Sequence, residues 1–281
     1  LLVNSSALAA KVAAALGPSW HVELAMRYGR PSLAAALASF AKAGIDRFVL
    51  FPMYPQMASS TIGSTVEETF RLVGEATIPP TLAVVPPFYD HPAFISALTA
   101  IGRPILARVR PEHVVFSFHG LPERQVRKAD GAGHCFSSDR CCAAMVPANR
   151  SCYRAQCFAT ARALSRALGL DAELVTVSFQ SRLGRTPWIG PHTEPVLAAL
   201  ATRGVKRVVV FSPAFVADCL ETLEELAIRG REAFRAAGGE ELVLVPAPNA
   251  HPAWVEAVLS LVAETSAWGG TPVPRRAVDS A

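Results

Sequence analysis

The feature that most constrains the fold of this chain is a regular alternation of short apolar runs with longer helical segments. The runs at residues 47–51, 114–118 and 207–211 are rich in Val and Phe, which is typical of buried strands. Each run is followed, after a turn, by a segment of helical periodicity. Strands that alternate with helices in this way predict parallel sheets joined by right-handed crossovers.

The same pattern extends over almost the whole sequence. Strands are expected at residues 1–4, 22–27, 47–51, 81–85, 114–118, 173–179, 207–211 and 241–245. Helices are expected at residues 7–16, 31–43, 61–72, 92–105, 152–168, 191–203, 218–237 and 252–265. This α/β pattern predicts two similar Rossmann-like lobes, each with a parallel sheet, and a cleft between them. The Pro- and Gly-containing end, residues 269–281, is expected to be a loose tail.

Composition narrows the classes of function. Apolar residues make up 51% of the chain, enough for a large core, and the net charge is only +4. Without a Lys/Arg run or basic residues interleaved with aromatics, nucleic-acid binding is not expected. No apolar stretch of about 18 residues and no secretory signal are found. A soluble or surface-attached intracellular protein is therefore expected, and no G-x-G-x-x-G or Walker A pattern indicates a nucleotide site.

One imidazole stands where a buried strand should end. His119 follows the run Val114–Phe118 and precedes Gly120-Leu121-Pro122, which breaks the strand. Ligands of open α/β sheets bind at the carboxyl ends of the strands. His119 could be an ordinary loop residue, but its chemistry also suits proton abstraction near neutral pH or metal binding.

A row of carboxylates opens a later helix. Asp218, Glu221 and Glu225 are three and four positions apart and share one helical face after the strand at 207–211. Acidic residues in a first turn also suit the helix dipole, so a solvated face is the simpler interpretation. If His119 points into the same cleft, however, imidazole and carboxylates could handle Fe²⁺ or remove protons from an N–H.

Five of the six cysteines lie between residues 135 and 157. Disulfides are disfavoured inside the cell, and the paired C-x₂-C spacing of structural zinc is absent. A 2Fe–2S cluster, which needs four thiolates, is favoured over zinc or simple thiols. The expected ligands are Cys135, Cys142, Cys152 and Cys157, with Cys141 as a competitor, since adjacent Cys141 and Cys142 are not expected to bind one compact cluster together.

A further group of residues suits an aromatic, anionic ligand. Tyr28 stands beside Arg27 at an expected strand end, where it could line a pocket or simply form a turn. Arg30, Arg71 and Arg182 could meet the carboxylates of such a ligand, although each alone would be an ordinary surface residue.

These segments together resemble the ferrochelatase family. The resemblance rests on Val115–Pro122 (Val-Phe-Ser-Phe-His-Gly-Leu-Pro), on Ser178–Trp188 with its Ser-Phe-Gln-Ser-Arg, and on Ala217–Glu225 with its Leu-Glu-Thr-Leu. Arg27-Tyr28-Gly29 and Tyr54-Pro55-Gln56 are similar to earlier family segments. The similarity spans nearly the whole chain in the family's order.

The resemblance implies an enzyme that inserts Fe²⁺ into a porphyrin to give haem, with protoporphyrin IX favoured. It implies that His119 and Glu221 are catalytic and metal-binding, and that Asp218 and Glu225 form an acidic conduit for metal ions or protons. The residues implied to line the porphyrin pocket are Tyr28, Arg71, Gln180, Ser181 and Trp188. Cys219 occupies a position that is His in some members and Cys in many bacterial ones.

The resemblance also implies domain boundaries. Residues 1–86 and 247–281 would form the first lobe with a returning C-terminal helix, and residues 87–246 the second lobe. Residues 135–151 would be an insertion that carries the cluster, with a structural or sensing role. After a strand ending at Asn4 the family continues with Leu-Gly-Thr-Pro and a lip over the porphyrin, whereas here Ser5 follows Asn4 directly. Either this segment is deleted or the given sequence omits it between Asn4 and Ser5, and the second alternative is favoured.

Other functions stay open at this point. One alternative is a non-catalytic tetrapyrrole or iron binder or sensor; others are insertion of Fe²⁺ into coproporphyrin or of cobalt into a related ring. The expected partners are a porphyrin and ferrous iron, without nucleic acid. The expected location is the cytoplasm, with peripheral attachment to the inner face of the membrane kept open and the oligomeric state unassigned.

Overall fold

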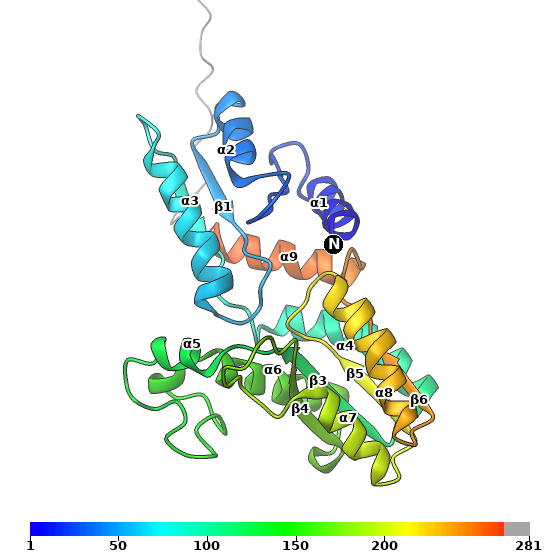
Figure 1. The fold of residues 1–281 in the computed structure, drawn as a ribbon. Helices are drawn as coiled ribbons and strands as arrows, with labels where there is room; N and C mark the ends of the chain where they lie inside the picture. Colours follow the sequence, from blue (N-terminus) through cyan, green and yellow to red (C-terminus); the bar gives the residue numbers. More distant parts are fainter. Residues whose placement is uncertain (267–281) are drawn as a thin grey trace, which may run out of the picture.

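The computed structural model describes residues 1–266, and the predicted tail at 269–281 lies outside the described residues. Two separate parallel sheets organise the chain (Figure 1). The predicted α/β fold with parallel sheets is confirmed. In the described residues, however, the two sheets differ in size, with two strands in the first and four in the second.

The first sheet pairs β1 (Arg47–Leu50) with β2 (Thr81–Val84). The helices of this lobe are α1 (Leu2–Leu16), α2 (Leu33–Lys42) and α3 (Ser64–Gly74), and a short π-helix, η1 (Ser59–Gly63), leads into α3. Ser32 caps α2 by accepting a hydrogen bond from the backbone of Ala35, as a helix N-cap should.

The second sheet has the strand order β4-β3-β5-β6 and is parallel throughout. Its strands are β3 (His113–His119), β4 (Val175–Gln180), β5 (Arg207–Phe211) and β6 (Glu241–Leu244). β3 is central, and all of its residues except His119 are buried. This burial explains the continuous apolar run, because a central strand of a parallel sheet is covered on both faces.

Helices cover both faces of the second sheet (Figure 1). The helices that pack on it are α4 (Pro92–Val109), α6 (Tyr153–Leu168), α7 (Thr193–Thr202) and α8 (Arg231–Ala236). The remaining elements are α5 (Glu123–Lys128), α9 (Pro252–Thr265) and the 3₁₀ turns η2 (Pro147–Asn149) and η3 (Ala172–Leu174). α9 packs on both α1 and α4. Its fully buried Trp254 stacks near Phe88 and Phe94, so the C-terminal helix ties the two lobes into one core. Within residues 1–266, no helix is both long and apolar enough to cross a bilayer.

The segment predicted as one helix at 218–237 begins as a π-helix. η4 (Glu221–Gly230) adopts the wider π-helical spacing and passes directly into α8. A π-helix has i→i+5 hydrogen bonds, and long ones are rare and often functional. Residues four positions apart therefore lie on nearly the same side of η4, so Glu221 and Glu225 share one side of this helix.

Two predictions about the first lobe are wrong. Residues 1–4 do not end a strand, because Leu2 to Asn4 lie inside helix α1. A short apolar run cannot be told from the start of a helix by periodicity alone. The missing segment considered between Asn4 and Ser5 rests also on the resemblance to the family, and it stays a prediction. Residues 22–27 also form no strand and contribute only an isolated bridge between Met26 and Ser32.

Candidate active site

His119 is the last residue of β3, at the carboxyl edge of the four-stranded sheet. Its Nδ1 lies 2.6 Å from the carbonyl oxygen of Gly120. A carbonyl only accepts hydrogen bonds, so in the neutral ring Nδ1 carries the proton and donates it. Nε2 is then left with its lone pair, the form in which imidazole takes up a proton or binds a metal.

Two aromatic rings lie against this imidazole. The centroid of the Trp188 ring is 6.5 Å from that of His119, and the centroid of Phe215 is 6.2 Å away. Trp188 reaches the site because its backbone pairs with Pro122, beyond the end of β3. Tyr153 donates a hydrogen bond to the carbonyl of His119 at 2.7 Å, which holds the backbone at the end of β3 in place. The imidazole is thus held among aromatic surfaces.

Gln180 pairs with His119 in the parallel register of β3 and β4. Its side chain is 3% exposed and lies within the protein rather than in an open pocket. Its Nε2 donates to the carbonyl of Glu221 at 2.9 Å, and its Oε1 accepts from the Ser117 hydroxyl at 2.7 Å. Gln180 therefore connects the strand of His119 to the first residue of η4, although the sequence predicted it as a pocket wall.

Glu221 begins η4 and is partly buried. It contacts Cys219, and burial and this contact raise the pKa of the Cys219 thiol to about 12. Asp218, by contrast, is only 7% exposed and accepts hydrogen bonds from the Thr222 hydroxyl, the Ala247 N–H and the Asn249 amide, at 3.0, 3.2 and 2.7 Å. Its carboxylate anchors the start of η4 to the loop after β6.

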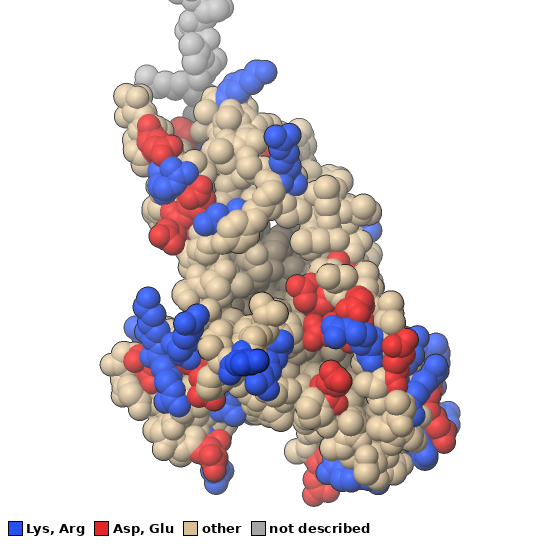
Figure 2. Space-filling view, viewed as in Figure 1, with Lys and Arg blue, Asp and Glu red and all other residues tan. Residues whose placement is uncertain are grey.

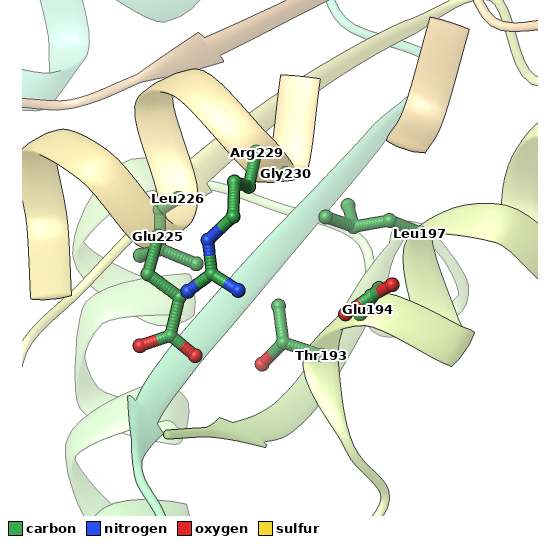
Figure 3. A pocket seen from close by; sticks show the side chains of 7 residues that line it. All are labelled: Thr193, Glu194, Leu197, Glu225, Leu226, Arg229 and Gly230. Carbon is green, nitrogen blue, oxygen red and sulfur yellow. The ribbon is translucent and has the colours of Figure 1, made fainter. Parts of the chain in front are cut away.

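Glu225 is also engaged. Its Oε1 accepts the backbone N–H of Ser181 at 2.7 Å, and its Oε2 accepts the Ser181 hydroxyl at 2.5 Å. It lines a small cavity of about 80 Å³ together with Thr193, Glu194 and Arg229 (Figure 3). Arg229 is bound to Glu224 at 2.7 Å. The acidic row thus ends at an arginine.

The remaining predicted pocket residues belong to the first lobe. Tyr28 is 74% exposed, lies 3.4 Å from the Ser64 hydroxyl and carries Arg27 over its ring at 4.5 Å. Arg71 lies about two helical turns beyond Ser64 on α3, where it pairs with Glu68 and Glu75 at 2.9 and 2.5 Å. These ion pairs are with residues of its own helix, and the role of Arg71 at the porphyrin stays a prediction.

The two lobes meet through specific contacts beside the site. Gln56, which follows β1, is 2% exposed and donates to Thr160 at 3.0 Å and to the carbonyl of Pro213 at 3.3 Å. The N–H of Met57 donates to Gln156 at 2.6 Å. Figure 2 shows a hollow between the part that carries α2 and α3 and the part that carries the larger sheet. The hollow has the position of the predicted cleft.

The cysteine segment forms a separate centre. Two of the sulfurs, those of Cys141 and Cys142, lie 3.7 Å apart. Cys152 lies close enough to Cys135 and Cys142 to shift the pKa values of both thiols. Cys157, predicted as a ligand, instead shares a hydrogen bond with the fully buried Tyr153. All five are buried and none forms a disulfide.

Charge is unevenly distributed over these thiols. Cys152 is the N-cap of α6, and its hydrogen bonds to Cys142, to the Ala155 N–H and to Cys135 lower its pKa to about 6. The same contact with Cys152, together with burial, holds the pKa of Cys142 far above its ordinary value. Arg154 lies 3.5 Å from the Cys142 sulfur and 3.8 Å from that of Cys141. Cys152 is therefore the thiol that ionises first.

A single-ion site is not found in this part of the chain or elsewhere in residues 1–266, where no three His, Cys, Asp or Glu side chains converge on one ion. A 2Fe–2S cluster makes a different demand, because its four thiolates are shared between two irons. Cys135, Cys141, Cys142 and Cys152 would fit such a donor set, and the Arg154 guanidinium beside Cys141 and Cys142 would offset part of its negative charge.

Sequence reasoning missed several residues of these sites. Phe215, Ser117 and Tyr153 contact or support His119, but they look like ordinary residues of strand and helix. The only signal was position: Ser117 and Phe215 lie at or after the carboxyl ends of β3 and β5, and Tyr153 begins the helix that leaves this edge.

Comparison with known proteins places the chain among chelatases. The sequence profile of the ferrochelatase family matches residues 1–266. The chain is 50% identical over 260 residues to a ferrochelatase of Azotobacter vinelandii, which covers 91% of this chain and 77% of that protein. It is also 50% identical over 238 residues to a ferrochelatase of Ectopseudomonas mendocina, covering 84% and 70%.

Solved structures show the same fold at low sequence identity. SirB from Bacillus subtilis, determined with Fe³⁺, matches with a TM-score of 0.64 at 17% identity and covers 94% of this chain and 89% of that one. CbiX, described as the terminal enzyme of sirohaem biosynthesis in denitrifying bacteria, matches with a TM-score of 0.55 at 14% identity and covers 92% and 90%.

Proposed function

This chain belongs to the ferrochelatase family, enzymes that insert Fe²⁺ into a porphyrin to form haem, and on this premise we propose which of its residues carry the reaction. His119 and Glu221 are the catalytic pair, and the porphyrin occupies the hollow between the lobes. The observation that carries this proposal is the hydrogen bond from His119 Nδ1 to Gly120, which in the neutral ring places the lone pair on Nε2.

The overall chemistry fixes what these groups must do. Formation of haem replaces two pyrrole N–H protons with one Fe²⁺, so two protons must leave the ring. Nε2 of neutral His119 can accept one proton or hold the ion as it sheds water, and the Glu221 carboxylate can do the same on the facing element. Gln180 supports this pairing, since it joins the end of β4 beside His119 to the carbonyl of Glu221.

The aromatic side chains suit a flat, apolar ring. Trp188 and Phe215 stand beside His119, and pockets for such ligands are lined mainly by apolar and aromatic groups. Tyr28 would lie on the opposite wall, on the first lobe. Because haem is the iron complex of protoporphyrin IX, a ring with two propionates, protoporphyrin IX is the proposed substrate.

An anaerobic insertion assay tests this function. The purified full chain is supplied with Fe²⁺ and protoporphyrin IX, and haem absorbance is followed; coproporphyrin is the comparison substrate. Catalytic turnover with protoporphyrin supports the proposal. Stoichiometric porphyrin binding without turnover would favour the non-catalytic binder, and a preference for coproporphyrin would revise the substrate.

The proposed domain boundaries are residues 1–86 with 247–281, and residues 87–246. The packing of α9 on α1 supports the return of the C-terminal helix, and so does the hydrogen bond from Lys11 Nζ to the carbonyl of Ala250 at 2.7 Å. The proposed location is the cytoplasm, with peripheral attachment to the inner face of the membrane kept as an alternative.

A 2Fe–2S cluster is proposed at the cysteine segment, held by Cys135, Cys141, Cys142 and Cys152. This set replaces Cys157 with Cys141, because the Cys141 sulfur contacts Cys142 whereas Cys157 is bound to Tyr153. When bound, such a cluster would supply one-electron redox chemistry or a structural link. Since it sits on an insertion apart from His119, a structural or sensing role is proposed.

A further inference from the structure

Two successive residues at the end of β4 hold two successive turns of η4. The Gln180 amide donates to the carbonyl of Glu221, and Ser181 donates both its N–H and its hydroxyl to the carboxylate of Glu225. Glu221 and Glu225 are four positions apart, so in a π-helix they stay on nearly the same side. The end of β4 is therefore hydrogen-bonded to η4 at two positions, Glu221 and Glu225.

Ser181 has the backbone conformation that its two hydrogen bonds to Glu225 require. Its φ is +63°, in the left-handed region that non-glycine residues seldom adopt. This conformation lets the N–H and the hydroxyl of one residue reach both oxygens of one carboxylate. A strained position of this kind persists only where the surroundings hold it, and Glu225 supplies the contacts.

The carboxylates of Glu224 and Glu225 are engaged within the protein. Arg229 follows Glu225 four positions later and lines the same cavity (Figure 3). Glu224 binds this guanidinium at 2.7 Å, and Ser181 binds both oxygens of Glu225. Both carboxylates of this part of η4 therefore already have partners within the protein.

We infer that Ser181 and Glu225 are positioning residues and not part of a path for metal ions. Together with Gln180 they hold η4 in register with β3 so that Glu221 faces His119. This inference rests on the proposal that Glu221 acts with His119. The positioning role differs from the conduit role predicted for Glu225. Positioning requires the shape of the carboxylate, whereas a conduit for cations requires its negative charge.

Paired substitutions at Glu225 separate the two roles. Glu225→Gln keeps the shape: the amide oxygen still accepts the Ser181 N–H, and the rotatable Ser181 hydroxyl accepts from the new amide. Glu225→Ala removes both contacts. Glu232→Gln, which neutralises an exposed carboxylate on α8, where η4 continues, is the matched control.

The measurements are kcat, and KM for Fe²⁺, in anaerobic insertion by the full chain. For Glu225→Ala the inference predicts about a tenfold or larger fall in kcat with little change in KM, because both hydrogen bonds from Ser181 are lost while the path for metal is untouched. Glu225→Gln should restore kcat to within about threefold of the parent. Ser181→Ala should cost less in kcat than Glu225→Ala, and the two effects should not add in the double variant.

The opposite pattern overturns the inference. If Glu225→Gln loses as much kcat as Glu225→Ala, or if both raise KM for Fe²⁺ several-fold while Glu232→Gln does not, the charge of Glu225 is what the enzyme uses. Should Glu225→Ala fail to fold, Glu225→Gln still decides between the roles. Failure of the His119–Glu221 proposal is recognised separately, by full activity in the Glu221→Gln variant.

Discussion

His119 Nδ1 and the carbonyl oxygen of Gly120 lie 2.6 Å apart, so adjacent residues at the end of one strand set the tautomer of the imidazole. The same Gly120 donates its N–H to the Gln180 carbonyl at 2.8 Å. One glycine therefore orients the imidazole and joins the ends of β3 and β4. The two strands meet at the point where the chemistry is proposed.

Replacing Gly120 with alanine should damage the site. A Cβ there would lie 2.8 Å from the backbone oxygen of Gln180 and 3.1 Å from Trp188 Cε3, and the backbone oxygen cannot move away cheaply. We expect a destabilisation of about 1–3 kcal/mol, typical of overpacking, and a marked loss of kcat as the strand ends separate. Thermal unfolding and the insertion assay measure both effects.

Gly74→Ala is the matched control for this substitution. Gly74 ends α3, and a Cβ there would meet nothing within 4 Å. It should leave kcat unchanged. Equal losses in the two variants would mean that the close approach at Gly120 does not matter.

Much of this arrangement could be predicted from sequence. The apolar runs of β3 and β5 identify buried parallel strands, and the Gly-Leu-Pro after His119 marks a strand end. The π-helical form of η4 could not be predicted, because carboxylates three and four apart also fit an α-helix. Nor could the engagement of Gln180 and Glu225, since it depends on which donors of other elements pack against them.

Which cysteines lie together as candidate cluster ligands could not be predicted from the sequence either. Spacing alone suggested that neighbouring Cys141 and Cys142 would compete for one position. In the structure the loop folds so that both sulfurs lie together, while Cys157 points to Tyr153 from inside α6. Sequence distance does not report which thiols meet.

The ligand set is tested by single substitutions. Cys141→Ser should abolish the visible absorption and the iron of the purified protein, because a 2Fe–2S cluster requires four thiolates. Cys157→Ser, also buried and close in sequence, is the control and should keep both. Loss of colour in Cys157→Ser with retention in Cys141→Ser would restore the assignment made from spacing, and a colourless, iron-free parent protein would remove the cluster.

The iron-free protein should become more stable as pH rises from 6 to 9. Folding lowers the pKa of Cys152 from 9.0 to about 6, so the folded state favours the thiolate. The resulting stabilisation is complete above pH 9 and is lost as pH falls through 6. We expect the free energy of unfolding of the parent, minus that of Cys152→Ser, to increase across this range in urea titrations. A difference that stays flat or falls would show that Cys152 does not ionise early.

The most direct test of the account is the His119→Ala variant in the anaerobic insertion assay, with porphyrin binding measured in parallel by fluorescence quenching. The account predicts that Fe²⁺ insertion is abolished while the porphyrin still binds, because Trp188 and Phe215 remain and only the unprotonated Nε2 is lost. Full insertion activity in His119→Ala would contradict it.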